Sequence, residues 1–288
     1  MENKDKEKKK KKKKVITDEK RNQLEQYLSC QNQDGSSKNP NYRIDDIFNF
    51  DNAEKSSLEC LFILESPHID EVKEKYPLAG DSGKAVTKFL FGDKTSIPFG
   101  KLVKLNSDLL KFKHIAIMNV SNVPLQTVKG YNDDYASLAD YLEALRDPKA
   151  NKETAGFDCL LKLFEDRLKN ILKACERIKR KTHIFVCGQM AVNYFEKASQ
   201  KKSSSKANKD ASIITDIEVE ENIQELLKNG LYEITYIPHP SRNHWSSTKY
   251  VKYKENLPIL KKEFDPLYLL PSERMNRTFQ ITFTIKEI

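Results

Sequence analysis

LECLFILESPHIDEVKEKYPLAGDSGKAVTKFL, residues 58–90, is the segment from which we interpret the rest of the chain. Its apolar run, residues 61–64, predicts a buried strand that ends at the polar residues Glu65, Ser66 and His68. A turn flanked by glycine then leads into a helix that we expect to begin near Ser82. Open α/β sheets bind ligands at the carboxyl ends of their strands, so we expect Glu65 to face such a site.

Three more apolar runs predict further strands, and helical patterns alternate with them. The four predicted strands cover residues 58–64, 114–120, 182–187 and 231–237. Helices are predicted at residues 82–91, 135–145, 154–178, 188–198, 219–228 and 246–264. Strands that alternate with helices favour an α/β fold, in which helices cover both faces of a parallel sheet.

The composition of the chain divides it into four parts. Residues 1–17 form a lysine-rich tail that we expect to be disordered, and residues 18–41 contain a helix (18–28) followed by a polar loop. Residues 42–265 make up the α/β domain, with a low-complexity insertion at residues 200–212 that we expect to be mobile. In the C-terminal extension, residues 266–288, apolar and polar residues alternate from residue 277 onward and predict a strand with one buried face.

Composition also argues against several classes of protein. Of the 288 residues, 38% are hydrophobic and 32% charged, and no apolar run approaches the roughly 18 residues of a membrane span. The N-terminus lacks the apolar stretch of a secretory signal, so we expect a cytoplasmic protein without membrane contact. The five cysteines lie far apart with no Cys-x-x-Cys pair, which argues against a metal centre and against a disulfide framework.

The net charge of +8 comes mostly from the N-terminus. Residues 1–14 contain nine lysines and three acidic residues, which leaves 41 of the 50 basic and 39 of the 42 acidic side chains to the rest of the chain. The tail either raises nonspecific affinity for nucleic acid or serves as a solubilising or targeting segment. Its charge therefore does not identify a substrate.

The polar turn after the first predicted strand has more than one interpretation. Glu65 is either a surface carboxylate or a group held in a partly dry crevice, where it would orient water or stabilise positive charge. Ser66 and His68 are a poor nucleophile and base, because they lie two residues apart and no Gly-x-Ser-x-Gly elbow is present. Residues 80–84 (GDSGK) do not make a phosphate-binding loop, since Leu78 and Ala85 stand where that motif needs glycine and a hydroxyl residue.

A second polar turn follows the last predicted strand of the sheet and carries His239 between two prolines. The histidine either simply ends the strand or is held in one direction by the fixed backbone of its neighbours. The loop after it supplies side chains that suit contact with phosphates and unstacked bases, namely Ser241, Arg242, Asn243, His244 and Trp245. We expect this turn to face the turn that carries Glu65.

Five short motifs, taken in order, resemble those of the uracil-DNA glycosylase superfamily, especially its branch with glutamate in the first motif. The family pattern is Gly-Glu-Ala-Pro-Gly-x-Asp-Glu, then Pro-Phe-x-Gly-x-x-Gly, a strand ending in Thr-Asn, a strand ending in glycine, and His-Pro after the last strand. The matching segments here are residues 65–71 (ESPHIDE), 77–83 (PLAGDSG), 118–119 (MN), 187–188 (CG) and 239–241 (HPS). Order and spacing hold over roughly residues 58–260.

The resemblance implies a three-layer α/β/α domain with a four-stranded parallel sheet, and DNA as the partner. Such enzymes flip a nucleotide out of the duplex and hydrolyse the bond between base and sugar without a metal. We therefore expect a monomeric DNA glycosylase, without any cofactor, that removes a deaminated or otherwise modified base. Its role would be DNA repair or defence against foreign DNA such as that of a phage.

The same resemblance implies roles for individual residues. Glu65 and Glu71 would position water and stabilise the sugar cation, and His239 would stabilise the departing base. Asn119 would read the base edge. The other implied contacts are to DNA: Ser66, Pro67 and Ser241 would hold backbone phosphates, and Arg242, Asn243 or Trp245 would fill the gap left by the flipped base.

Several positions depart from the family pattern. Leu64 and His68 stand where the family has glycine, so the floor of the pocket would be bulkier. Leu78 stands where the family stacks a phenylalanine on uracil, unless nearby Tyr76 takes that part, so we expect a base other than plain uracil. The four cysteines of cluster-binding members are missing at matching places, and we expect no iron–sulfur cluster.

Two other functions remain compatible with the sequence. One is a nucleic-acid-binding module of the same fold that has lost catalysis, which would leave the glycosidic bond intact. The other is a small-molecule enzyme of a nucleotide-binding α/β type. We disfavour that second function because no glycine-rich fingerprint follows the first strand.

Overall fold

The computed structural model describes residues 16–31, 36, 39–48, 58–92, 96–106, 112–176, 181–200, 223–228, 232–241, 245 and 251–264. Four predictions fall wholly or largely outside these ranges. They are the disorder of the lysine-rich tail, the mobility of the insertion after Gln200, the C-terminal strand, and the contacts of Arg242 and Asn243.

A five-stranded sheet forms the centre of the molecule. Four strands run parallel, β2 (Cys60–Leu64), β3 (Ile115–Asn119), β4 (Thr182–Cys187) and β5 (Tyr232–Ile237), and they match the four predicted strands. The strand order is β1-β3-β2-β4-β5, in which β1 (Ile47–Phe48) pairs antiparallel with the edge of β3. The prediction of a four-stranded sheet is therefore wrong by one strand, because two residues are too short to show a period.

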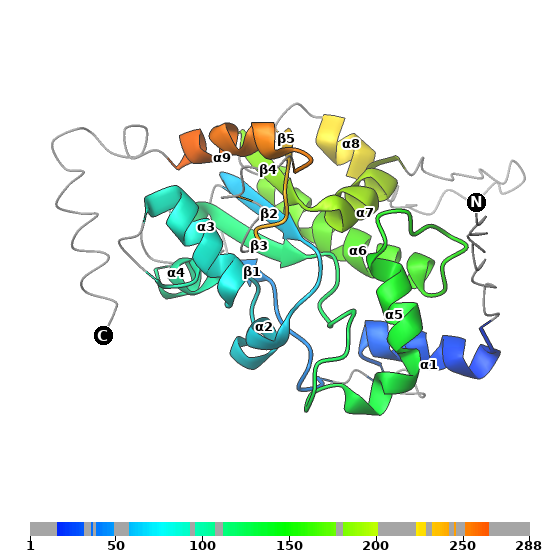
Figure 1. The fold of residues 1–288 in the computed structure, drawn as a ribbon. Coiled ribbons are helices and arrows are strands. Elements are labelled where there is room, and N and C mark those ends of the chain that lie inside the picture. Colours follow the sequence, from blue (N-terminus) through cyan, green and yellow to red (C-terminus); the bar gives the residue numbers. More distant parts are fainter. Residues whose placement is uncertain are drawn as a thin grey trace, which may run out of the picture.

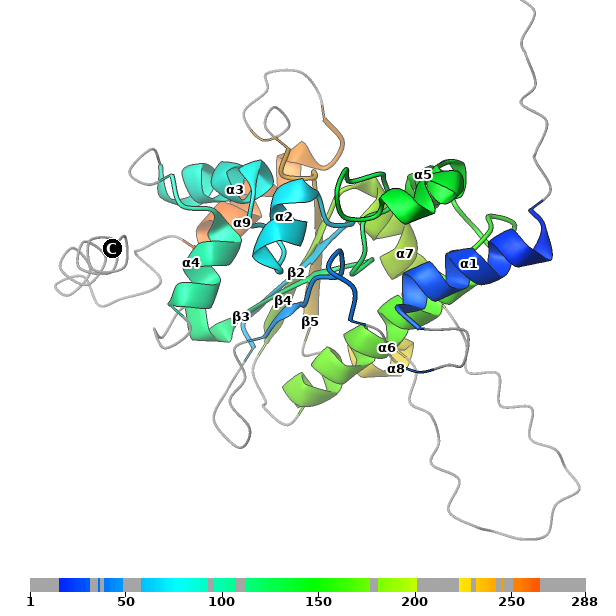
Figure 2. The ribbon, with the colours of Figure 1, turned by 90° about the horizontal axis from the view of Figure 1, so that it is seen from below.

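Alternate residues of the buried strands face two separate hydrophobic cores. In β2, Leu61 and Ile63 belong to one core, whereas Cys60, Phe62 and Leu64 belong to the other. Each core is closed by helices, so the domain has three layers, as Figure 2 shows with the sheet seen nearly on edge. The expected α/β class and its layering are present.

The helices divide between the two faces of the sheet (Figures 1 and 2). One face is covered by α1 (Asp18–Ser29), α5 (Ala139–Arg146), α6 (Phe157–Glu176), α7 (Gln189–Gln200) and α8 (Ile223–Lys228). The other face is covered by α3 (Asp81–Phe91), α4 (Phe99–Leu105) and α9 (Leu257–Glu263). A short helix, α2 (Ile69–Glu74), follows the turn at the carboxyl end of β2.

Most predicted helices are present, with shifted ends. The stretch predicted at 135–145 begins as a 3₁₀ turn (Asp133–Leu138) and continues as α5. Residues 246–250 of the closing helix predicted at 246–264 lie outside the described ranges. Residues 251–253 are not helical, and a 3₁₀ turn (Lys254–Asn256) and then α9 follow them. Tyr253 has a left-handed backbone (φ 68°), which stops a helix from continuing through this point. The helices α2 and α4 are too short to show a periodic pattern and were not predicted.

Four cysteines of the described chain are free thiols. Cys30, Cys60 and Cys187 are buried, and Cys159 is partly buried. Burial raises the pKa of the Cys159 thiol to about 11, so this group stays protonated near neutral pH. No helix within the described ranges is both long enough and apolar enough to span a membrane.

Candidate active site

A cavity of about 530 Å³ opens at the carboxyl end of the sheet. The turn after β2 contributes Glu65, Ser66 and His68, and β3 contributes its last residue, Asn119. From the turn after β5 come His239 and Ser241. The two turns that were expected to face each other therefore line one cavity, although they are 170 residues apart or more in the chain.

Gly188 lies where the two turns meet. A Cβ atom at this glycine would be 2.5 Å from Glu65 Oε1 and 3.0 Å from the Cβ of His239. Its backbone has φ +94°, and its N–H donates to the carbonyl of Ile237 at 2.9 Å. The absence of a side chain at position 188 thus leaves room for the carboxylate and the histidine beside the same point.

Backbone hydrogen bonds hold the end of β3 against the turn after β2. Val120 N–H donates to the carbonyl of Leu64 at 2.9 Å, and Ser121 N–H donates to that of Glu65 at 3.1 Å. Leu64 also pairs directly with Asn119 in the parallel ladder. These bonds place Glu65 and Asn119 on adjacent chain segments at one end of the sheet.

The side chain of Asn119 is buried, with 1% of its surface exposed. Its Nδ2 has no hydrogen-bond partner, although Asn119 lines the cavity. An unsatisfied buried donor costs roughly 1–3 kcal/mol, and a ligand acceptor in the cavity would recover this cost if the amide turned toward it. Asn119 therefore has the properties of a ligand-binding residue.

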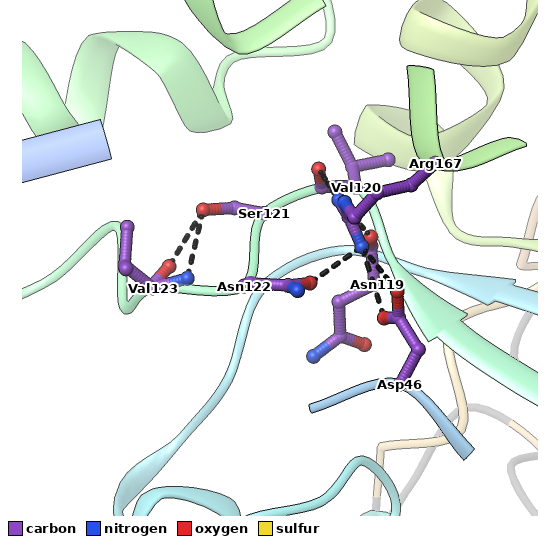
Figure 3. Close-up of polar contacts among 7 residues, drawn as sticks. All are labelled: Asp46, Asn119, Val120, Ser121, Asn122, Val123 and Arg167. Carbon is purple, nitrogen blue, oxygen red and sulfur yellow. Dashed lines mark hydrogen bonds and ion pairs between the residues drawn. The ribbon is translucent and has the colours of Figure 1, made fainter. Parts of the chain in front are cut away.

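Arg167, from α6, fixes the backbone that carries Asn119 (Figure 3). Its Nη2 donates to the carbonyls of Asn119 at 2.8 Å and Val120 at 2.6 Å, and its Nη1 donates to Asp46 at 2.9 Å and to the side chain of Asn122. In Figure 3 the Asn119 amide points away from this guanidinium. The arginine thus holds the turn and leaves the amide of Asn119 for the cavity.

Glu71 lines the cavity, but backbone donors occupy both of its oxygens. His68 N–H donates to Oε2 at 2.8 Å, and Leu78 N–H donates to Oε1 at 2.6 Å. Burial, the largest effect, raises the pKa of this carboxyl to about 7, against the lowering effect of the two hydrogen bonds. This geometry gives no support to Glu71 as a second catalytic carboxylate. It supports a role in joining the start of α2 to the turn at Leu78.

Leu78 forms part of the cavity wall with an uncommon backbone conformation, φ +55°. Its N–H is held by Glu71, and its carbonyl accepts the N–H of Gly100 at 3.0 Å. Tyr76 does not line the cavity, and its ring lies under the ammonium of Lys104 at 4.4 Å. The suggestion that Tyr76 takes the place of a stacking aromatic is therefore wrong, and an aliphatic side chain stands there.

Two predicted contact residues do not line the cavity. Pro67 is buried in the turn and does not line the hollow. Trp245 is only 6% exposed, packs edge-on against Phe89 at 5.0 Å and donates from Nε1 to the carbonyl of Pro238 at 2.9 Å. The prediction that Trp245 fills the gap of a flipped base is corrected, because core packing and this hydrogen bond hold the indole.

Two residues of the wall, Gln126 and Arg146, lie outside every segment that the sequence analysis connected with the site. Gln126 lies in an irregular connection after β3, where no pattern fixes a direction. Arg146 ends α5, and a basic residue in the last turn of a helix is common because it complements the helix dipole. Neither residue stands in a recognisable motif.

Acidic side chains outnumber basic ones on the cavity wall. Glu65, Asp70, Glu71 and Asp81 line it, and among the described residues Arg146 is the one lysine or arginine that does. No group of three or more His, Cys, Asp or Glu side chains in the described part of the chain is arranged to hold a metal ion.

A second titratable cluster joins β4, β5 and α9. His183 Nε2 lies 2.7 Å from Thr235 Oγ1, its Nδ1 lies 3.3 Å from Glu263 Oε1, and its ring stacks on Phe185 at 4.1 Å. Although a hydroxyl, an imidazole and a carboxylate in contact resemble a hydrolytic triad, none of the three residues lines the cavity. His183 is the second residue of β4, at the end of the strand remote from Gly188, so we assign this cluster to stability.

Comparison with known proteins adds no relative to this description. No protein-family model matches the chain, and the search of curated proteins returns no match. The function must therefore be argued from the cavity and its side chains.

Proposed function

We propose that this protein is a DNA glycosylase that hydrolyses the N-glycosidic bond of a flipped-out, deaminated or otherwise modified nucleotide. The observation that carries the proposal is the convergence of Glu65 and His239 beside Gly188 on one cavity. The resemblance of the five motifs to the uracil-DNA glycosylase superfamily supports the same function, and so does the α/β sheet whose strand ends carry those motifs.

The reaction separates charge, and the two side chains suit its two sides. As the bond from C1′ to the base nitrogen breaks, positive charge develops on the sugar and negative charge on the base. Glu65 would stabilise the sugar cation and orient water, whose hydroxyl joins C1′. The remaining proton of that water ends on the base nitrogen, and His239 would donate a hydrogen bond to the departing base.

Asn119 would supply recognition of the base. Its amide offers both a donor and an acceptor, and its Nδ2 lacks a partner in the described structure. Leu78 would contact the face of the base through dispersion only, without aromatic stacking. A pocket of this kind favours a base that differs from uracil in shape or substituents.

Mass spectrometry of the bases released from a panel of DNAs tests the proposal. The panel carries ordinary, deaminated and modified nucleobases in single and double strands. We expect release of at least one modified base, and we expect Glu65→Gln and His239→Ala each to slow that release by about 10²–10⁴-fold. Glu74→Gln is a matched control, because Glu74 is exposed on the neighbouring helix α2.

The same panel separates catalysis from binding alone. If no base is released from any DNA while DNA still binds the protein, the proposal is wrong and an inactive nucleic-acid-binding module takes its place. If release occurs but Glu65→Gln leaves its rate unchanged, the assignment of the carboxylate is wrong.

A further inference from the structure

Arg146 stands on the cavity wall without a role in the proposed reaction. It is the last residue of α5, and it is the single lysine or arginine among the described residues that line the cavity. The carboxylates of Asp70 and Asp81 approach the cavity from α2 and α3, whereas Arg146 approaches from α5. In Figure 2, α2 and α3 lie on one side of the strand ends and α5 lies on the other.

The main chain around Arg146 is fixed by contacts with α7. Tyr194 donates from its hydroxyl to the carbonyl of Leu145 at 3.2 Å, and Asn193 donates from Nδ2 to the carbonyl of Ala150 at 2.9 Å. Both acceptors flank the arginine in the chain. The base of the side chain is therefore held in place beside the cavity, as a binding residue requires.

The guanidinium has only part of its hydrogen-bonding capacity in use. Its Nη1 pairs with Glu143 Oε2 at 2.9 Å, but the side chain of Glu143 is 66% exposed, and such surface pairs contribute little. Its Nε is buried and has no hydrogen-bond partner. An arginine binds a carboxylate or a phosphate best through two adjacent N–H groups. Nε belongs to one such pair of N–H groups, and it has no partner here.

Two donors without partners therefore belong to the wall of the same cavity. They are Nδ2 of Asn119, from β3, and Nε of Arg146, from α5. Each costs free energy while it stays unsatisfied, and a ligand acceptor that reached it would recover that cost. Two such atoms from different elements indicate a ligand that brings oxygen acceptors to both.

We infer that Arg146 is a further substrate-binding residue, which pairs with an oxyanion of the DNA substrate. This oxyanion is either a phosphodiester beside the flipped nucleotide or an acidic group on the modified base. The inference rests on the proposed function in one respect, since it takes DNA as the ligand. It assigns to the α5 side of the cavity a contact that neither the motifs nor the proposed catalytic pair includes.

Binding to a duplex with a central tetrahydrofuran abasic site tests the inference without requiring any base release. Fluorescence anisotropy would compare wild type, Arg146→Gln, Arg146→Lys and Lys149→Gln. Lys149 is exposed, lies three residues after Arg146 and does not line the cavity. Lys149→Gln therefore removes one positive charge from the surface and leaves the cavity wall unchanged. If the oxyanion is a phosphodiester, we expect Arg146→Gln to weaken binding about tenfold or more and to lower the salt dependence by about one counterion, and we expect Lys149→Gln to have little effect.

Two arms of the experiment identify the source of the oxyanion. In the first, each phosphate near the abasic site is replaced singly by an uncharged methylphosphonate. If Arg146 binds a phosphate, one replacement will weaken DNA binding by the wild-type protein. On that duplex, wild type and Arg146→Gln will then bind with equal affinity. In the second arm the duplex carries 5-carboxycytosine, and an effect of Arg146→Gln confined to this duplex would place the oxyanion on the base.

If Arg146→Gln binds every duplex as tightly as Lys149→Gln does, the inference is overturned. Thermal unfolding of each variant shows that a loss of binding does not come from a loss of fold, and Arg146→Lys, which keeps the charge, should recover part of the affinity. The outcome is distinct from that of the proposed function. If DNA binding depends on Arg146 but no base is released, the proposed glycosylase function alone is wrong. If a base is released and neither its release nor DNA binding depends on Arg146, this inference alone is wrong.

Discussion

Arg167 reaches from α6 to the turn after β3, where its guanidinium joins Asp46 to the carbonyls of Asn119 and Val120. Asp46 is 6% exposed, so loss of this partner would leave a buried carboxylate without its ion pair. Arg167→Lys keeps one charge but loses the planar fork, and we expect the free energy of unfolding to fall by about 3 kcal/mol. Urea unfolding measures this loss, with Lys162→Gln as the exposed control on the same helix. A variant as stable as wild type would show that the network contributes little.

Glu71 predicts a specific dependence of stability on pH. Burial raises its pKa from 4.5 to about 7, so the folded protein binds more protons than the unfolded chain between these values. The contribution of Glu71 to the free energy of unfolding is therefore largest at low pH and decreases as the pH rises toward 7. Glu71→Gln cannot titrate and loses one acceptor at every pH.

The measurement is the free energy of unfolding of wild type and of Glu71→Gln in urea, from about pH 5 to about pH 8. We expect the advantage of wild type over the variant to shrink across this range and to level off above pH 7. Glu74→Gln, exposed on the same helix, should show no such trend. A difference that stays constant with pH would contradict the raised pKa of Glu71.

Single side chains were predictable from the sequence where they follow a buried strand directly. Glu65, Asn119 and His239 each stand at or just after a strand end, and parallel strands bring such positions to one edge. Arg146 and Arg167 act across the fold from helices, and their contacts depend on packing that no local pattern encodes. Trp245 failed as a prediction because loop composition does not show which way a side chain turns.

Among the elements, the turn of Pro77 and Leu78 is clamped between two helices. A Cβ at Gly83, in α3, would come within 1.9 Å of the Leu78 carbonyl oxygen. A Cβ at Gly100, in α4, would come within 2.0 Å of the Pro77 carbonyl oxygen. Both helices therefore reach the turn only because these positions lack a side chain.

Gly100→Ala tests this clamp. Alanine in a helix is ordinarily favoured over glycine by about 1 kcal/mol, but here we expect a destabilisation of about 1–3 kcal/mol from the forced contact. The turn should shift with Leu78, so substrate binding should weaken as well. Thermal unfolding and the Michaelis constant measure the two effects. Lys101→Ala, exposed at the next position of α4, is the control, and a stabilised Gly100→Ala would contradict the close approach.

Elements were predicted well where burial is continuous and poorly where they are short. The four parallel strands are runs of five or six residues, and all residues of β2, β3 and β4 are buried, so these three strands are mostly apolar in the sequence. The strand β1 and the helices α2 and α4 have two, six and seven residues, too few to establish a period. Hydrogen bonds and packing fix where these short elements begin and end. At the start of α2, for example, the N–H of His68 donates to the side chain of Glu71.

For the molecule as a whole, positive charge is concentrated at the N-terminus of the chain. Residues 1–14 carry nine lysines, whereas the rest of the chain is nearly neutral. We expect removal of residues 1–14 to weaken binding to unmodified duplex DNA and to reduce the slope of affinity against salt concentration, because fewer counterions are released. Single-turnover base release at saturating protein should stay unchanged. A truncated chain with an unaltered salt slope would show that the lysines do not contact DNA.

Gly188 gives the molecule one further property. Since a single methyl group there would press on Glu65 and His239 together, the chemistry could be extinguished by one substitution while every layer of the domain stayed in place. A related protein with alanine at position 188 would retain both Glu65 and His239. A comparison of those two positions alone would classify it as active. Glycine at position 188 is thus a better indicator of an active protein than the presence of Glu65 or His239.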